Sequence, residues 1–306
     1  MSLTLTTVSK LTEDEARATF ERIRWPNGPV CPHCGSVEAT KLEGKAHRVG
    51  LYKCKGCEDQ FTATINTILE DSHLPICTWL MAFAILCSAK KGISALQLQR
   101  QLGLGSYRTA WHLCHRIRHA MSKEPLVGML KGTVEVDEAY IGGKPRREHG
   151  KPKAKRGRGT KKVPIVALVE RGGNVRARKV DRVDGKTLKT AIRKNVDRSS
   201  TIMTDEFRVY HGIGKEFAGG HYTVNHSQGE YVNGDASTNE VESYFALLKR
   251  GVVGSFHHVS KQHLDRYCDE FSFRWNHRQI SDSERTAEAI KSAEGKRLMY
   301  RDPIKK

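Results

Sequence analysis

The chain has 306 residues, of which 52 are Lys or Arg and 34 are Asp or Glu, so its formal net charge is +18. That length allows one sizeable core and one or two smaller modules. The excess of positive charge predicts a polyanionic partner, with nucleic acid as the first candidate. The start of the chain has no apolar signal-like run, and its most apolar stretch, 76–89, is too short to span a bilayer. We therefore expect a cytoplasmic, nucleoid-associated protein.

The first predicted module is an N-terminal helix within residues 1–25. Thr12 followed by Glu15 forms a capping-box pattern at its start. The next segment, 26–65, is short, punctuated by Gly, and contains two Cys-x-x-Cys pairs. Its paired cysteines are Cys31, Cys34, Cys54 and Cys57.

These paired cysteines predict a structural zinc ribbon. Four thiolates on two tight turns match a tetrahedral zinc ion, and so small a segment has too little core to fold without one. Two disulfides or idle thiols are the alternative, which a reducing compartment disfavours. Because a shell of four thiolates leaves no position for a substrate, we expect this zinc to be structural rather than catalytic.

Residues 66–125 are predicted to be helical, and a helix-turn-helix pattern lies within them. One helix should end at Gly103 and a second should begin after Ser106. We expect Arg108 on the second helix to reach DNA, with other polar positions at His112, His115 and Arg116. An ordinary helical hairpin packed on the core explains the same pattern, so both interpretations stay open at this point.

Residues 126–280 alternate strands and helices in the order of an α/β, ribonuclease H-like core, a mixed sheet flanked by helices. Three strands come first, followed by helix, strand, helix, strand and helix, and residues 281–306 are expected to form a C-terminal tail. The predicted strands are 133–141, 163–170, 175–180, 200–204 and 221–224, and the main helices begin near Asp184 and Thr238.

A basic loop, 144–162, separates the first two of these strands. So dense a run of like charge cannot bury itself, and we expect it to contact DNA phosphates. Its candidate contacts are Arg146, Arg147, Lys153, Lys155 and Arg156.

Three acidic residues in this core could meet at one site. Asp137 lies in the first strand, Asp205 directly follows the fourth, and Glu242 lies in the helix after Thr238. Two strand ends and a helix can converge although they are distant in sequence. Mg²⁺ prefers such oxygen ligands, and two such ions held by carboxylates activate a water or a 3′-hydroxyl for phosphoryl transfer on DNA.

The helix after Thr238 carries a second clue. At 100° per residue, Glu242 and Lys249 face the same way beside an apolar stripe, so one could bind metal and the other a phosphate. Asn239 lies some 60° further round the same helix. A solvated helix face with an ordinary charge pair is the alternative, but it would leave the two aspartates at strand ends unexplained.

These motifs together resemble bacterial insertion-sequence transposases of the DDE type, in the group with an N-terminal zinc ribbon and a D, D, N/E, K signature. The matching text includes Val134 to Glu138, Gly142 to Lys144, Thr204 to Glu206, Thr238-Asn239 and Lys249 to Gly251, and further matches run to Arg278. The resemblance implies that Asp137, Asp205 and either Glu242 or Asn239 bind Mg²⁺ or Mn²⁺. It also implies that Lys249 contacts a phosphate. We favour Glu242 as the third ligand because an anionic group binds Mg²⁺ better than an amide does.

The sequence therefore predicts a transposase that binds the terminal inverted repeats of its own element in double-stranded DNA, cuts there and transfers strands to target DNA. We expect Lys249 and Arg250 to contact this DNA and the protein to act as a homo-oligomer on it. Two alternatives remain. A zinc-ribbon DNA-binding regulator with an inactive or domesticated core would need no acidic triad, whereas a junction resolvase would need no ribbon.

Overall fold

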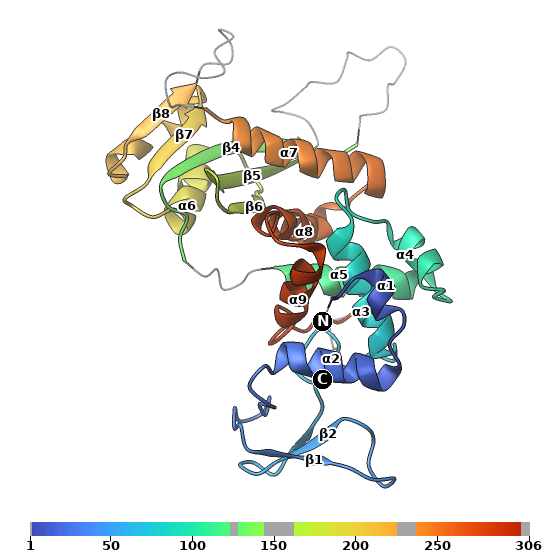
Figure 1. Ribbon diagram of the computed structural model, residues 1–306. Coiled ribbons are helices and arrows are strands. Elements are labelled where there is room, and N and C mark those ends of the chain that lie inside the picture. Colours follow the sequence, from blue (N-terminus) through green and yellow to red (C-terminus); the bar gives the residue numbers. More distant parts are fainter. Residues whose placement is uncertain (1, 123–127, 144–161, 225–236, 301–306) are drawn as a thin grey trace, which may run out of the picture. The chain divides into compact units, whose positions relative to one another are not determined.

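A computed structural model describes residues 2–122, 128–143, 162–224 and 237–300 (Figure 1). The chain divides into two compact units, and each is described by itself. Unit 1 consists of Met1–Lys123 and Gln279–Lys306, and unit 2 of Glu124–Arg278. No helix among the described residues has the length and apolar character that crossing a membrane requires.

Unit 1 is a helical body joined to a small ribbon of strands. Its second helix begins with the predicted capping box, in which Thr12 and Glu15 bond each other's backbone amides. The buried helix α3 supplies much of its core. The helices are α1 (Leu5–Val8), α2 (Glu13–Arg24), α3 (Ile76–Ser88), α4 (Ala95–Gln101), α5 (Tyr107–Met121) and α9 (Asp282–Lys291).

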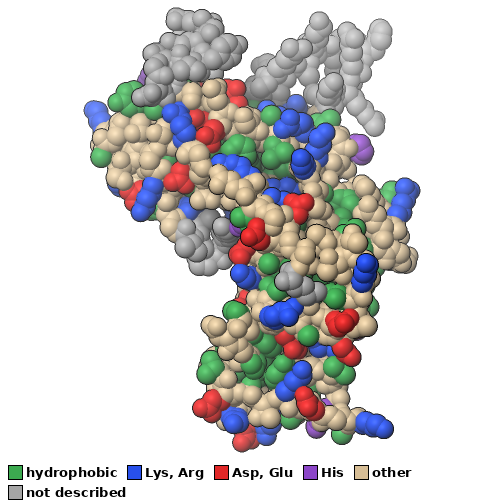
Figure 2. All heavy atoms as spheres, viewed as in Figure 1, with side chains coloured by type: hydrophobic (Ala, Val, Ile, Leu, Met, Phe, Trp, Pro, Cys, Tyr) green, Lys and Arg blue, Asp and Glu red, His purple; other side chains and the backbone are tan. Residues whose placement is uncertain are grey.

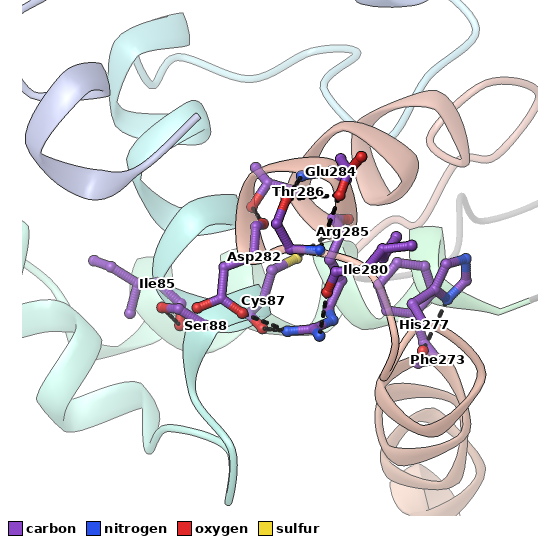
Figure 3. A network of polar contacts seen from close by, with 11 residues as sticks. Ile85, Cys87, Ser88, Phe273, His277, Ile280, Asp282, Glu284, Arg285 and Thr286 are labelled. Atoms are coloured by element: carbon purple, nitrogen blue, oxygen red, sulfur yellow. Dashed lines mark hydrogen bonds and ion pairs between the residues drawn. The ribbon is translucent and has the colours of Figure 1, made fainter. Parts of the chain in front are cut away.

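Helix α9 lies in the segment that we expected to be a tail, and it packs into unit 1 instead. The Arg285 guanidinium donates to the carbonyl of Cys87 at 3.1 Å and to the carbonyl of Ile280 at 3.2 Å, which ties α9 to the end of α3 (Figure 3). A second capping box, between Ser281 and Glu284, starts the helix. Helix α9, from the end of the sequence, thus completes a core formed by helices from the first part of the chain.

The ribbon contains a three-stranded antiparallel sheet of β1 (Ala39–Leu42), β2 (Leu51–Cys54) and β3 (Gln60–Phe61). An aromatic cluster packs the ribbon against the end of α2, and in it Trp25, Tyr52 and Phe61 have ring centroids 5.6 to 5.8 Å apart. The Tyr52 hydroxyl donates to Glu21 of α2 at 3.0 Å, which joins the ribbon to the helices.

Helices α4 and α5 form the predicted pair. The prediction that α5 carries a polar face directed at DNA is wrong in part. His115 is completely buried, and Arg116 is buried with its guanidinium 5.2 Å from the Trp79 ring. Arg116 also donates to the carbonyl of Glu70. Of the four polar positions expected on α5, only Arg108, at its start, is exposed.

Unit 2 contains a five-stranded sheet in the order β6-β5-β4-β7-β8. β4 pairs antiparallel with β5 and parallel with β7, and β7 pairs parallel with β8. Three antiparallel strands extended by two parallel ones match the mixed ribonuclease H-like sheet predicted from the sequence. The strands are β4 (Thr133–Ile141), β5 (Val163–Glu170), β6 (Val175–Lys179), β7 (Thr201–Asp205) and β8 (His221–Val224).

Helices cover both faces of this sheet, so the central strand β4 has no solvent face (Figure 1). Val134 and Val136 point toward α6 (Gly185–Asn195), where Leu188 and Ile192 meet them. The alternate face packs against α7 (Asn239–Gly251) and α8 (Leu264–Asn276). A π-helical turn, Val252–Phe256, follows α7.

Helix α8 also covers the edge of the sheet at β6. The Asn276 side chain accepts from the Val175 amide at 2.7 Å and donates to its carbonyl at 3.2 Å. Further along, Asp269 accepts from Arg178 at 2.7 Å. These bonds satisfy polar groups at a sheet edge that would otherwise be open to pairing with another strand.

Candidate active site

Asp137 lies on β4 on the side of the strand that faces α7. Side chains alternate along a strand, so Asp137 shares this face with Ala139, which belongs to the core under α7. The adjacent Glu138 points to the opposite face. Its carboxylate accepts from the hydroxyl of the buried Tyr210 at 2.8 Å.

Asp205 is the last residue of β7, the parallel neighbour of β4. Glu135 pairs with Met203 in this ladder, so continuing the register by two residues brings Asp137 level with Asp205. Asp205 thus lies at the carboxyl end of β7, whereas Asp137 lies in the middle of β4, which continues to Ile141, and not at the strand end that we expected. The Phe207 amide donates to Asp205 at 3.1 Å and holds the turn that follows.

Glu242 enters from α7, where it occupies an exposed position in the first turns of the helix. Thr238 donates to its carboxylate at 3.3 Å. Asn239, the first residue of the helix, is also exposed. Lys249 lies two turns beyond Glu242 and lines a groove together with Glu138 and Tyr140.

Asp137 lies within electrostatic reach of the other two predicted carboxylates. Burial, the first cause, raises the pKa of Asp137 to about 7, and the negative charges of Glu138, Asp205 and Glu242 contribute to the rise. Crowded carboxylates with raised pKa values are typical of sites that hold a cation or perform acid and base chemistry.

The donor set fits a hard divalent cation, since all the converging groups are carboxylate oxygens. Among the described residues, only the four cysteines place three or more candidate ligand atoms within 4.8 Å of one another. The acidic residues are therefore spaced more widely than the ligands of one compact ion.

The ribbon carries the second candidate metal centre. The Cys31 and Cys57 sulfurs lie 3.7 Å apart and the Cys34 and Cys54 sulfurs 3.6 Å apart. Four sulfurs about 2.3 Å from one zinc ion in a tetrahedron would be about 3.8 Å apart, so this cluster fits structural zinc. The Cys57 and Gly56 amides lower the pKa of Cys54 to about 6, whereas burial and the neighbouring sulfurs raise the pKa of Cys57 to about 12. Thiols crowded in this way share few protons and need a cation to become four thiolates.

The predicted DNA contacts fall in three places. In unit 1, the Arg108 guanidinium lies 5.7 Å from the Tyr300 ring. In unit 2, Lys249 and Arg250 are exposed at the end of α7, and Figure 2 shows Lys and Arg side chains gathered over this helix. The remaining candidates lie outside the described residues, and they are Arg146, Arg147, Lys153, Lys155 and Arg156.

Sequence reasoning missed one group beside this site, the carboxylate of Glu135. It is completely buried two residues before Asp137 and bonds the start of α7. A signal was present, because a second acidic residue stands on the same face of a strand whose other residues are mostly apolar.

Comparison with known proteins agrees with this architecture. The ISXO2-like transposase domain matches residues 129–276, and the transposase zinc-ribbon domain matches residues 11–60. An uncharacterized protein in transposable element ISH50 of Halobacterium salinarum is 29% identical over 275 residues, which cover 86% of this chain and 91% of that protein. The chain therefore belongs to the insertion-sequence transposases that join a zinc ribbon to a ribonuclease H-like DDE domain.

Solved transposase structures are more distant. The Mos1 strand transfer complex is 13% identical with a TM-score of 0.28, over 68% of this chain and 72% of that one. The Mos1 transposase paired-end complex with left transposon end is also 13% identical, with a TM-score of 0.29 over 68% and 73% of the two chains. Scores this low carry no argument about geometry, so the fold assignment rests on this chain's own strand order and on the matching domains.

Proposed function

We propose that this protein binds the terminal inverted repeats of its own insertion sequence, cuts the DNA there and joins the released 3′-hydroxyl ends to target DNA. The observation that carries the proposal is the convergence of Asp137, Asp205 and Glu242 from β4, β7 and α7, with Lys249 on the same helix. A regulator that only binds DNA would have no use for this arrangement.

In this proposal Asp137 and Asp205 are the two constant ligands of the catalytic cations, and Glu242 is the third. Mg²⁺ or Mn²⁺, when bound there, supplies activation of the attacking oxygen and stabilisation of the leaving oxygen. Asp137 gives up its proton when the site fills, because a cation favours the carboxylate. Asn239 is the competing third ligand, since it lies one turn before Glu242 on the same helix.

Lys249 holds the scissile strand in this proposal. Its exposed ammonium lines the groove beside β4, where it can pair with a DNA phosphate while Glu242 faces the cations. Arg250 and the loop 144–162 add contacts to the phosphate backbone. Such contacts fix the position of the duplex without reading its sequence.

The zinc ribbon and the α4–α5 pair supply end recognition in unit 1. The thiolate cluster stabilises the ribbon, and Arg108 at the exposed start of α5 is the candidate for base contacts. We propose double-stranded DNA as the partner, a homo-oligomer as the form that acts on paired ends, and the cytoplasm as the compartment.

Cleavage of a labelled duplex that carries the element's own ends tests this proposal. Wild-type protein should nick at the end of the repeat with Mg²⁺ or Mn²⁺ and do nothing in chelator. Binding of the same duplex without any cation-dependent cleavage, under conditions where the zinc site is filled, would favour a DNA-binding regulator instead.

A further inference from the structure

The start of helix α7 is capped by a side chain from the central strand of the sheet. The carboxylate of Glu135 accepts from the Glu240 amide at 2.8 Å and from the Val241 amide at 3.1 Å. These are the second and third residues of the helix, whose amides have no partner within it. The N-cap residue, Thr238, makes no side-chain capping bond to these amides.

Glu135 is completely buried, so its negative charge needs compensation. The positive end of the helix dipole supplies part of it. Arg171, in the turn after β5, supplies the rest, because its guanidinium lies 3.1 and 3.2 Å from the same carboxylate.

The turn after β5 also reaches the helix directly. Arg171 donates to the Ser237 hydroxyl at 2.9 Å, and the Gly172 amide donates to the Glu240 carboxylate at 2.9 Å. The first turn of α7 is therefore tied to two neighbouring strands. Its distance from β4 and its rotation about its own axis are both fixed by these bonds.

This cap lies between two of the candidate metal ligands. Asp137 is two residues after Glu135 on the same face of β4. Glu242 directly follows Val241, whose amide donates a hydrogen bond to Glu135. One buried carboxylate on the strand of Asp137 thus holds the helix that carries Glu242.

We propose that Glu135 is a positioning residue that sets the separation of Asp137 and Glu242 for cation binding. The inference rests on the proposed function of these two carboxylates. Replacing a group that orients metal ligands without touching the metal commonly lowers metal affinity or activity by roughly 10- to 100-fold. A residue needed only for folding would not change metal affinity in protein that remains folded.

Glu135→Gln is the first test, because the amide keeps the shape but loses the charge. Mn²⁺ binding is measured by electron paramagnetic resonance, with Asp137→Asn protein as the background for other sites. We expect roughly 10- to 100-fold weaker Mn²⁺ binding, cleavage reduced in step and partly restored at high Mn²⁺ concentration, and unchanged affinity for the end duplex.

Glu170→Gln is the matched control. Glu170 lies at the same turn and accepts from the Asn174 and Lys131 amides, each at 3.3 Å, so its hydrogen bonds within the described part of the chain stay away from α7. This variant should bind Mn²⁺ and cleave as the wild type does. An equal loss in Glu170→Gln would mean that disturbance of the turn, and not the helix cap, causes the effect, and would overturn the proposal.

Glu135→Asp is the second variant, in case Glu135→Gln does not fold. Its side chain keeps the negative charge but is one methylene shorter, so this variant should fold and show a smaller loss of Mn²⁺ affinity. Folded variants that bind Mn²⁺ like the wild type overturn the positioning role, as does failure of both variants to fold. If wild-type protein itself does not cleave, the proposed function fails, whereas normal wild-type cleavage with unaffected Glu135 variants removes this inference alone.

Discussion

At the residue scale, two residues of helix α7, Glu242 and Asn239, compete as the third ligand of the proposed catalytic cations. Glu242→Gln should retain DNA binding and folding but lose cleavage by orders of magnitude, because an amide supplies no charge to the cations. Asn239→Ala should cost far less. Single-turnover cleavage rates of the two variants decide between them, and the reverse ranking would assign the ligand to Asn239.

The pKa of Asp137 gives a second prediction at this scale. In folded protein without cation, the Asp137 carboxyl keeps its proton up to about pH 7, because its pKa is raised to about 7. In unfolded protein the same carboxyl loses its proton near its ordinary pKa of 3.8. The stability from this proton is fully present below about pH 4 and is lost as pH rises through about 7. The shift of about three pKa units corresponds to at most about 4 kcal/mol.

Urea unfolding at pH 5 and pH 8, without divalent cation, measures this effect. The free energy of unfolding of Asp137→Asn should fall less than that of the wild type between these two values. Cation binding to the wild type should also tighten with rising pH and release a proton below about pH 7. A pH dependence identical in the two proteins would contradict the assigned environment of Asp137.

At the level of residues, the sequence located the strand of Asp137, the strand that ends at Asp205 and the helix of Glu242, because local periodicity reveals strands and helix faces. The metal-binding roles of these three residues stay predictions. It failed for His115 and Arg116. Their helix has polar residues at regular positions, but segments distant in the sequence cover them, and Arg116 donates to the carbonyl of Glu70. Local pattern cannot reveal which polar residues a distant segment will bury.

At the scale of elements, the strands of unit 2 and the helices α6 and α7 follow the predicted bounds closely. The helix expected between the fourth and fifth strands is replaced by two short 3-10 turns, Arg208–Tyr210 and Ile213–Glu216. In unit 1, helix α9 was not expected. Its capping box at Ser281 and Glu284 was present in the sequence, but the helix is short and amphipathic, and its apolar face has partners only in the first part of the chain. Position near the end of the chain was a poor guide to packing.

The ribbon yields a prediction about metal removal. Cys34→Ser, or strong chelator, should remove one zinc ion per chain by elemental analysis and unfold the segment 26–65, which the aromatic cluster alone cannot support. Fluorescence of Trp25 should report this change. Binding to the element's ends should then be lost while unit 2 stays folded.

Cys77→Ser is the control, because this thiol lies in α3, outside the cluster. It should retain zinc and end binding. Zinc absent from the wild type, or a ribbon that stays folded in chelator, would remove the assignment of a structural metal.

At the scale of the whole molecule, the formal charge of +18 needs a polyanion, and the loop 144–162 contributes much of the excess. Replacing four of its lysines with glutamine should weaken binding to all duplexes alike and reduce the slope of affinity against salt by roughly 3 to 4. Titrations at several salt concentrations, with specific and random duplexes, measure both. A changed sequence preference would show that the loop reads bases.

The central claim is that Asp137 and Asp205 perform DNA strand transfer, and joining of precut element ends to a supercoiled plasmid tests it most directly. Wild-type protein should produce joined product with Mg²⁺ or Mn²⁺ and none in chelator. Asp137→Asn and Asp205→Asn should bind the same ends with unchanged affinity and give no product. Normal joining by either variant would contradict the mechanism, whatever the affinity for DNA.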